Sequence, residues 1–596
     1  MTSPDTHATR LAALRAEMAR QGLDGFIVPR ADEHLGEYVP ASAERLAWLT
    51  GFTGSAGLAC VLADRAAVFT DGRYILQLEQ QTDGALWERR HVTEEPPPTW
   101  LALHAPAGAR IGYDPMLLSE EGLSRYTEAG LRMEPVSRNP LDAVWTDRPA
   151  PPRAKARAHP LRFAGRESAE KRAEIAAQLR AARQNAAILT DPASIAWLLN
   201  IRGDDVPFTP FALGFVILHD DARAELFMDA AKLDAELRAW LGNAVSVAPP
   251  EALGPSIAGL RGRVRVDPSG SPAWFAQQVR AAGAEPAAAP DPCLIAKACK
   301  NEVEQAGARA AHARDAIALC RFLHWLSGAA PAGTETEMSA AERLLALRAE
   351  HPAFRGESFP AISGAGEHGA VIHYRVTPDS DRPIRPNEVY LVDSGAQYPD
   401  GTTDVTRTVW TGPAAPPAEL RARATRVLKG HITVATLVFP QGVGGAHLDA
   451  FARRALWQVG LDYDHGTGHG VGSYLSVHEG PVSLSRLAKP VAIAPGMILS
   501  NEPGLYVPGA YGIRLENLLL VQLADLPGAA KPFLRFETLT LAPFDRRLID
   551  PALLDAGERA WLDAYHARVA AEVGPGLDAA ARLWLDAACL PLERSG

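Results

Sequence analysis

A short stretch of sequence recurs in this chain and predicts that its first half contains two copies of one fold. Ala47-Trp48-Leu49 returns as Ala196-Trp197-Leu198, and Phe69-Thr70-Asp71 has a counterpart in Phe227-Met228-Asp229. In each half a helical pattern precedes an apolar run typical of a buried strand. A repeated order of elements with short local similarity indicates a duplicated α/β domain.

The length of the chain requires more than these two domains. Its 596 residues exceed what a single hydrophobic core can fill. Prolines that neither a helix nor a central strand accepts interrupt it at residues 148–153 and again near Pro290. We therefore predict an N-terminal α/β domain (1–155), a second, related α/β domain (156–298), a third domain of mixed α+β class (299–530) and a C-terminal helical extension packed on it (531–596).

The third domain is expected to combine helices with a sheet. An amphipathic pattern at residues 301–328 predicts a long helix. Strand-like runs dominate residues 358–525, interrupted by helical patterns at 417–438 and 446–459. The tail from Phe533 onward is expected to be mostly helical, and it is apolar enough to dock.

Composition excludes several classes of partner. The 60 Lys and Arg against 70 Asp and Glu give a net charge of −10 without a basic stripe, so nucleic acid is not an expected partner. The five cysteines are scattered and lack CxxC spacing, which favours a reducing compartment. Neither a secretory leader pattern nor an apolar run of roughly 18 residues is found, so no membrane association is expected and the cytoplasm is the default location.

Two aspartates of the third domain lie where strands meet turns. An apolar run ends at Asp393, and Asp404 follows on a run with the period-2 alternation of a strand. A hairpin turning near Gly401 would bring the two carboxylates side by side. Such a pair resists joint ionisation, and a divalent cation removes that conflict. The alternative is that one aspartate caps a turn and the other faces solvent.

His469 lies in a glycine-rich run that begins at His465. Two histidines spaced i and i+4 could face a metal from a helix, but the glycines make a helix unfavourable here. We expect a loop or strand whose backbone passes close to a ligand, with a structural histidine as the alternative. The run does not match GxGxxG, so a dinucleotide loop is not expected.

Two glutamates also follow or interrupt apolar strands. One strand-like run delivers Glu502 at its end, before Pro503-Gly504. Glu516 lies within another apolar run, where an unpaired carboxylate is costly. Arg514, two residues earlier, offers a simpler explanation for Glu516, which is a buried ion pair.

One metal site explains all five residues jointly. Asp393, Asp404, His469, Glu502 and Glu516 supply carboxylates and one imidazole but no thiolate, a donor set that favours Mn²⁺ and leaves Zn²⁺ or Co²⁺ as alternatives. Two such ions, roughly 3.5–4 Å apart, can activate a water between them and polarise a peptide carbonyl. The residues therefore predict a dinuclear metallohydrolase.

The order Asp, Asp, His, Glu, Glu resembles that of the pita-bread metallopeptidases, the group of methionine aminopeptidase, prolidase and aminopeptidase P. Almost the whole chain looks like the cytosolic three-domain aminopeptidase P type, which implies two creatinase-like domains before a pita-bread catalytic domain. The motifs that carry this resemblance are Gly51-Phe52-Thr53-Gly54, Asp71-Gly72-Arg73-Tyr74, Ile372-His373-Tyr374, Val392-Asp393-Ser394-Gly395, Thr403-Asp404-Val405, His465 to Gly472, Val477-His478-Glu479-Gly480, Asn501-Glu502-Pro503-Gly504 and the tail residues Trp561 and Tyr565.

The resemblance implies an Xaa-Pro aminopeptidase, a hydrolase that releases the first residue of peptides with proline in second position by attack of a metal-bridged water. Asp393 and Asp404 would chelate, and His469 would bind one of two divalent ions. Glu516 would bridge the ions, and Glu502 would both bind metal and move protons. A homodimer is implied as well.

Four further residues receive roles from the resemblance alone. His478 would hydrogen-bond the developing oxyanion, His373 would position the substrate around the proline, and His465 would shuttle protons near the metal. Arg73, whose counterpart in the second copy is Ala231, would contact the substrate. Without the resemblance, the histidines would be ordinary core or surface imidazoles and Arg73 a surface arginine.

Three other functions compete with this one. A prolidase would cleave dipeptides that end in proline, but the three-domain length and Arg73 weigh against it. A binding module that has lost catalysis would hold a peptide or histone-like partner, but such relatives lose metal ligands and all five are present here. A creatine-type hydrolase on the same fold would need no metal.

Overall fold

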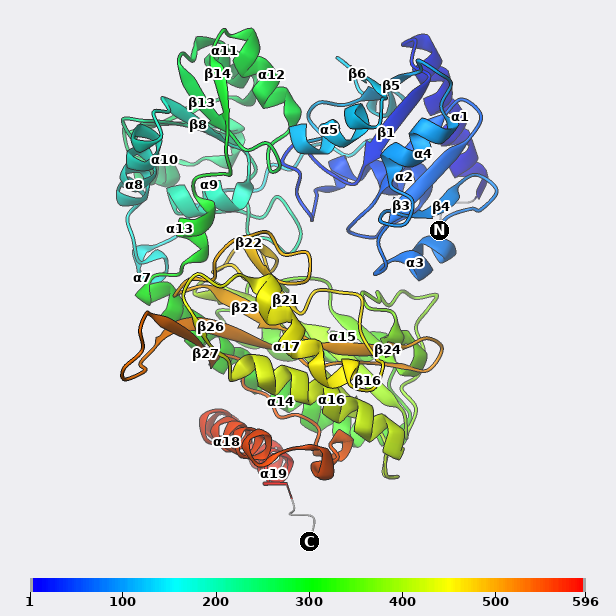
Figure 1. Ribbon diagram of the computed structural model, residues 1–596, viewed down its shortest axis with the longest axis vertical. Coiled ribbons are helices and arrows are strands. Elements are labelled where there is room, and N and C mark those ends of the chain that lie inside the picture. The colour runs from blue at the N-terminus through cyan, green and yellow to red at the C-terminus, as the bar shows by residue number, and fades with distance from the viewer. Residues whose placement is uncertain (1–3, 593–596) are drawn as a thin grey trace. The chain divides into compact units, whose positions relative to one another are not determined.

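The computed structural model describes residues 4–592 and divides into two compact units (Figure 1). The first unit runs to Leu294 without residues 162–165, and the second contains those four residues and the chain from Ile295 onward. Among residues 4–592, no helix is both long enough and apolar enough to cross a membrane.

The first unit contains two sheets with the same strand order. The strands run β4-β3-β2-β1-β5-β6 in one sheet and β12-β11-β10-β8-β13-β14 in the other. In each, the central strand pairs antiparallel with one neighbour and parallel with the other. This match confirms the predicted duplication of an α/β fold. The strands are β1 (Gly25–Pro29), β2 (Leu58–Leu62), β3 (Ala66–Thr70), β4 (Glu88–His91), β5 (Arg110–Tyr113), β6 (Arg132–Pro135), β8 (Ala186–Leu189), β10 (Phe215–His219), β11 (Ala224–Phe227), β12 (Val245–Ala248), β13 (Arg263–Val266) and β14 (Glu285–Ala288).

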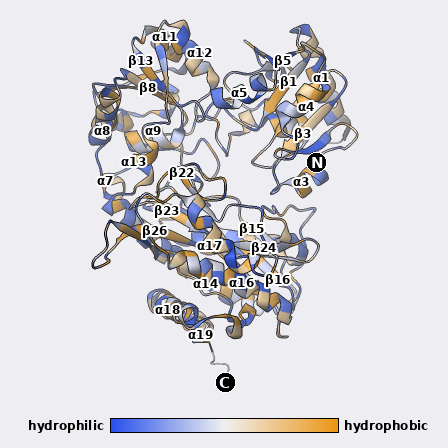
Figure 2. Ribbon diagram, viewed as in Figure 1, coloured by the Kyte–Doolittle hydropathy of each residue, from blue (hydrophilic) through white to orange (hydrophobic). Residues whose placement is uncertain are grey.

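Helices occupy equivalent places in the two copies. The recurring tryptophans lie in α2 (Arg45–Thr50) and α9 (Pro192–Leu199), each following the central strand of its sheet. All residues of β1 and β8 are buried, and Figure 2 shows the hydrophobic character of such central strands. The other main helices of this unit are α1 (Pro4–Arg20), α3 (Ile75–Gln81), α4 (Pro97–His104), α5 (Glu120–Glu128), α6 (Pro140–Val144), α8 (Ser168–Ala181), α10 (Ala235–Leu241), α11 (Leu253–Gly259) and α12 (Ala273–Ala281).

The second unit packs helices against a three-stranded sheet, β15-β16-β19, and a six-stranded sheet, β20-β27-β26-β23-β21-β22. Two hairpins, β17-β18 and β24-β25, accompany these sheets. The strands are β15 (Ile362–Ala365), β16 (Val389–Ser394), β17 (Gln397–Tyr398), β18 (Gly401–Thr402), β19 (Val405–Trp410), β20 (Val438–Pro440), β21 (Gly468–Gly470), β22 (Glu479–Leu484), β23 (Ile498–Asn501), β24 (Gly504–Val507), β25 (Tyr511–Arg514), β26 (Asn517–Ala524) and β27 (Phe533–Thr538).

The helices of the second unit follow the predicted patterns closely. A long helix, α14 (Glu302–Ala332), precedes α15 (Glu337–Ala349), and the two interior patterns form α16 (Ala418–Ala435) and α17 (Gly445–Trp457). Helices α16 and α17 pack against each other (Figure 1).

The chain after residue 531 begins with a strand and not with a helix, contrary to the mostly helical tail that the sequence predicted. β27 pairs with both β26 and β20, so this part of the tail completes the six-stranded sheet. Alternation between buried Leu534 and exposed Arg535 is the strand signal that the prediction overlooked. Helices α18 (Ala556–Val573) and α19 (Ala579–Ala588) follow, and α18 packs into a hydrophobic cluster with α16.

Candidate metal centre

Three of the five predicted ligands, Asp393, Asp404 and Glu502, lie at strand ends. Asp393 is the second-last residue of β16, and Asp404 immediately precedes β19. The predicted hairpin between them exists, with its turn between Tyr398 and Gly401. His469 lies in the short strand β21, and Glu502 directly follows β23. The ligands therefore come from both sheets of the second unit.

Glu516 does not lie inside a strand, which corrects the sequence prediction. Leu515 and Glu516 separate β25 from β26 because the chain changes sheets there, from the β24-β25 hairpin to the six-stranded sheet. The Glu516 amide donates to the Thr406 carbonyl at 3.2 Å, and the Glu516 carbonyl accepts from Arg407 Nη1 at 2.6 Å. Residues of β19 thus satisfy both backbone groups, although Glu516 is not itself part of a strand.

Three of the predicted ligands approach closely enough to share one ion. Ligand atoms of Asp404, His469 and Glu516 all lie within 4.8 Å of one another. His469 Nε2 lies 3.5 Å from Asp404 Oδ2 and 3.4 Å from Glu502 Oε1. The other ring nitrogen, Nδ1, lies 2.9 Å from the Gly470 carbonyl. A hydrogen bond from Nδ1 to that carbonyl orients Nε2 toward the acids, as second-shell bonds do for metal-binding histidines.

Asp393 is held by Arg514. The guanidinium Nη2 donates to Asp393 Oδ2 at 2.7 Å. This pairing rules out the alternative in which Arg514 explains Glu516, whose Oε2 accepts from the Thr406 hydroxyl at 2.9 Å. The other oxygen of Asp393, Oδ1, is buried and accepts no hydrogen bond from residues 4–592. A bound cation would provide the partner that this buried oxygen needs.

Burial and mutual repulsion raise the pKa values of three acids in this cluster. Burial raises the pKa of Glu516 well above its usual range, and the charges of Asp404 and Glu502 add to the effect. Burial also raises the pKa values of Asp393 and Glu502, against the opposing charges of Arg514 and His469 respectively. The acids thus bind protons more tightly than isolated carboxyl groups do.

The histidine of the cluster holds its proton as well. Burial disfavours the His469 imidazolium, but the hydrogen bond with Asp404 and the charge of Glu502 outweigh it and raise the pKa of His469 to about 9. A divalent cation would displace these protons and relieve the repulsion among the carboxylates. The oxygen-rich donor set, the three converging ligand atoms and the orphaned Asp393 oxygen therefore fit a divalent metal centre.

The three additional predicted histidines lie in the same unit. His478 packs against His469, with ring centroids 4.4 Å apart and rings nearly perpendicular, at 88°. His465 Nε2 lies 2.9 Å from the Tyr506 hydroxyl, which accepts from Arg514 Nη1 at 2.7 Å. A chain of hydrogen bonds therefore connects His465, through Tyr506 and Arg514, to Asp393.

His373 is connected to the same arginine through the backbone. The carbonyl of the preceding residue, Ile372, accepts from Arg514 Nη1 at 3.2 Å. Arg514 thus contacts a predicted ligand and the peptide group beside a predicted substrate-positioning residue.

Family models match four successive segments of the chain. The model of metallopeptidase family M24 matches residues 306–522, which contain all five predicted ligands, and a model of the C-terminal region of such peptidases matches residues 532–592. Two models of the creatinase/prolidase N-terminal domain match residues 10–141 and 147–304.

Whole-chain relatives agree with these segments. A protein of Aspergillus fumigatus described as "Probable Xaa-Pro aminopeptidase P" is 41% identical over 94% of this chain and 88% of its own length. A protein of Ajellomyces dermatitidis with the same description is 38% identical, over 95% of this chain and 96% of its own. The chain belongs to metallopeptidase family M24.

A solved member of this family has the same fold throughout. The crystal structure of the Caenorhabditis elegans X-prolyl aminopeptidase, described as a cytosolic enzyme with a di-nuclear active site, matches with a TM-score of 0.93 and 33% identity. The match covers 98% of this chain and all of that one. The predicted fold class, two related α/β domains before a pita-bread domain with a C-terminal extension, is therefore correct.

Arg73 of this M24 protein lies in the first unit. Its Nε and Nη2 donate to the two carboxylate oxygens of Asp71, at 2.9 and 2.7 Å, and its guanidinium lies 5.3 Å from the centre of the Tyr74 ring. The second copy has the same turn, because the Ala231 amide donates to Asp229 as the Arg73 amide donates to Asp71. The two copies therefore match here in backbone and differ in side chain.

Sequence reasoning missed two polar residues of the M24 site. Arg514 gave a signal, since a charged residue interrupts an apolar run, but it was considered only as an alternative partner for Glu516 and not as a partner for Asp393. Tyr506 gave none, because its contact with Arg514 depends on how the β24-β25 hairpin folds back.

Proposed function

We propose that this chain is a metal-dependent Xaa-Pro aminopeptidase, which releases the N-terminal residue from peptides with proline in second position. The observation that carries the proposal is the convergence of Asp404, His469 and Glu516 in a chain that is 41% identical, over 94% of its length, to a relative described as a "Probable Xaa-Pro aminopeptidase P". A cytoplasmic location agrees with the description of the nematode relative as cytosolic.

Two divalent ions would be held by Asp393, Asp404, His469, Glu502 and Glu516. When bound, the ions supply the Lewis acidity that activates a water and polarises the scissile carbonyl. The donor set of carboxylates with one imidazole favours Mn²⁺, with Zn²⁺ and Co²⁺ as alternatives.

Glu502 would move the proton that the reaction requires. The nitrogen of an Xaa-Pro bond, like that of any peptide bond, leaves as an amine only after it gains a proton. Glu502 takes a proton from the attacking water and returns it to that nitrogen. The Ser500 hydroxyl donates to Glu502 Oε1 at 3.1 Å and orients the carboxylate.

The histidines would act on the substrate around this carboxylate. His478, packed on His469, donates a hydrogen bond to the carbonyl oxygen as negative charge develops there. His373 positions the peptide around the proline, and His465 exchanges protons through its contact with Tyr506. We also propose a substrate contact for Arg73, whose guanidinium is oriented by Asp71.

Peptide hydrolysis tests the activity directly. The substrates are Xaa-Pro-Yaa, Xaa-Ala-Yaa and the dipeptide Xaa-Pro, each assayed after chelation and again with Mn²⁺ restored. Release of the first residue from Xaa-Pro-Yaa alone, and only with metal, is the expected result. Asp404→Asn should abolish it, whereas Asp400→Asn, which removes a carboxylate paired with Arg314 at 2.9 Å, should not.

Other results would select other functions. Cleavage confined to the dipeptide would make the chain a prolidase, and hydrolysis without metal would favour creatine-type chemistry. No turnover with any metal would leave a peptide-binding module.

The assembly state has its own test. We propose a homodimer, and light scattering after size exclusion should give a mass near twice 63.8 kDa. A single species at the monomer mass would refute the dimer without affecting the proposed activity.

A further inference from the structure

His373 lies in an irregular stretch of chain that follows a short 3-10 helix. The His373 segment, defined here as residues 366–381, begins with the short 3-10 helix η4 (Gly366–Ala370) and continues irregularly to Asp381. A side chain on an irregular segment keeps a fixed position only when other residues hold the backbone around it. The contacts of this segment therefore determine where the His373 imidazole points.

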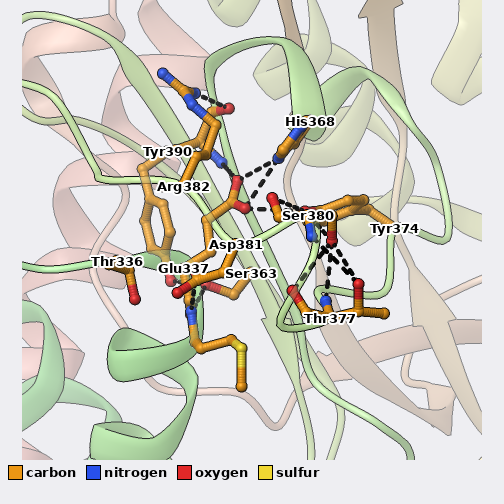
Figure 3. A network of polar contacts seen from close by, with 12 residues as sticks. Thr336, Glu337, Ser363, His368, Tyr374, Thr377, Ser380, Asp381, Arg382 and Tyr390 are labelled. Atoms are coloured by element: carbon orange, nitrogen blue, oxygen red, sulfur yellow. Dashed lines mark hydrogen bonds and ion pairs between the residues drawn. The ribbon is translucent and has the colours of Figure 1, made fainter. Parts of the chain in front are cut away.

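The backbone is held on both sides of His373. On one side, the Ile372 carbonyl accepts from Arg514 Nη1 at 3.2 Å. On the other, the Tyr374 hydroxyl donates to Glu337 Oε2 at 2.9 Å (Figure 3). Tyr374 is itself buried, so this hydrogen bond is shielded from water.

Glu337 is the centre of a larger network. It is the first residue of α15, and its side chain is 0% exposed. Oε1 accepts from the Ala365 amide at 2.7 Å, and both carboxylate oxygens lie 2.9 Å from His368 Nδ1. One buried carboxylate thus ties together the end of β15, the η4 helix and Tyr374, as Figure 3 shows.

The far end of the segment is attached to the same turn of α15. Asp381 Oδ1 accepts from the Met338 amide at 2.9 Å, and the Ser380 hydroxyl lies 3.1 Å from the Tyr374 hydroxyl. The free N–H groups and positive dipole end of a helix N-terminus favour carboxylates at this place. The His373 segment is therefore fastened at both ends to the start of α15.

We propose that Glu337 is a positioning residue for the aminopeptidase reaction. It fixes the Tyr374 side chain, and through it the backbone that presents His373 to the proline of the substrate. This inference rests on the proposed function. It gives the start of α15 a role in substrate recognition, although Glu337 acts through Tyr374 and not by touching the substrate.

Tyr374→Phe is the mildest test, since it removes only the hydroxyl. The hydrogen bond to Glu337 is lost together with the contacts of the hydroxyl with Ser380. The expected fall in kcat/KM for Xaa-Pro-Yaa is about three- to tenfold, and it should arise mainly from KM. Metal content and the unfolding temperature of the holoenzyme should change little. The matched control is Tyr390→Phe, because the Tyr390 hydroxyl is also buried but bonds to Ser363, at 2.6 Å, and not to the His373 segment. KM should stay unchanged in that variant.

A double-mutant cycle separates positioning from general support of the fold. If Tyr374 acts through His373, Tyr374→Phe should cause no further loss in a His373→Ala background. Glu337→Gln should likewise cause no further loss in the His373→Ala background. If Glu337→Gln does not fold, the Tyr374 cycle alone provides the test. Equal losses in both backgrounds, or an unchanged KM in Tyr374→Phe, would overturn the positioning role. The proposed function would still stand in that case, provided that the wild-type protein cleaves Xaa-Pro-Yaa. A wild-type protein that fails to cleave Xaa-Pro-Yaa would overturn both.

Discussion

The hydroxyl of Tyr565 accepts a hydrogen bond from Nη2 of Arg407 at 3.0 Å, and Nη1 of the same guanidinium donates to the Glu516 carbonyl at 2.6 Å. Arg407 is buried in β19, three positions after Asp404. Tyr565 belongs to α18, in the C-terminal extension. One arginine therefore connects this extension to the backbone of a predicted metal ligand.

Tyr565→Phe should weaken metal binding as well as stability. The change removes one of three acceptors around Arg407 Nη2, which keeps Asn517 Oδ1 and the Ala542 carbonyl. It leaves the Ala542 amide, 3.2 Å from the hydroxyl, without that acceptor, which should cost about 1–3 kcal/mol. Loss of outer support for a ligand lowers metal affinity by roughly tenfold or more. Urea unfolding of the chelated protein and Mn²⁺ titration measure the two effects. Trp561→Phe is the control, since it changes a ring that stacks on Tyr565 and packs against His431 but leaves the Tyr565 hydroxyl in place. Unchanged Mn²⁺ affinity in Tyr565→Phe would contradict the link.

Arg514→Met should make the protein more dependent on metal. The variant leaves the Asp393 carboxylate buried without its guanidinium partner, a change that costs roughly 3–5 kcal/mol in the metal-free protein. Mn²⁺ should recover part of this loss because it supplies positive charge to the same carboxylate. The rise in unfolding temperature on adding Mn²⁺ should therefore exceed that of the wild type.

Arg309→Met provides the comparison for that experiment. Arg309 pairs with Glu537 at 2.8 Å, but its side chain is 40% exposed. Exposed ion pairs contribute about 1 kcal/mol or less, so this variant should respond to Mn²⁺ as the wild type does. An equal response from Arg514→Met would show that metal binding does not depend on the Asp393 pair.

The cluster of candidate ligands could be predicted because its members have local signals in the sequence. Asp393 and Glu502 end apolar strands, and glycines surround His469, so short windows of sequence were sufficient. The partner of Asp393 could not be found in this way, because Arg514 is 121 residues away and reaches it only through the packing of the β24-β25 hairpin. The interruption between β25 and β26 at Glu516 could not be predicted either, because it marks where the chain passes from one sheet to another.

His566 should make the protein less stable in acid. Burial, aided by the charges of Arg407 and Arg546, lowers the pKa of His566 to about 3, and its Nε2 accepts from the Phe544 amide at 3.1 Å. The pKa in the unfolded chain is about 6.5, so the unfolded state gains the proton first as pH falls. The stabilising contribution is therefore complete above roughly pH 6.5 and declines toward pH 3, by up to about 1.4 kcal/mol per pH unit.

His566→Gln keeps an acceptor for Phe544 but cannot be protonated in this range. Its free energy of unfolding, measured in urea after chelation, should fall less steeply than that of the wild type between roughly pH 6.5 and 4.5. Substitution of the exposed His447 by Gln should leave the wild-type slope unchanged. Identical slopes for His566→Gln and the wild type would mean that this imidazole does not contribute.

Gly468 should tolerate no side chain, because the backbone of a neighbouring strand occupies the space. A Cβ at this position would overlap the carbonyl oxygen of Ser500, in β23. Gly468→Ala should therefore push β21 away from β23 and separate His469 from Glu502, at a cost of roughly 1–3 kcal/mol in stability and with a large loss of Mn²⁺ affinity. Gly466→Ala places its Cβ 3.3 Å from the Leu484 carbonyl, so a small shift accommodates it and both properties should stay near those of the wild type. If the two substitutions lowered Mn²⁺ affinity equally, the glycines would be needed for backbone flexibility. Close packing of the strands would then not explain them.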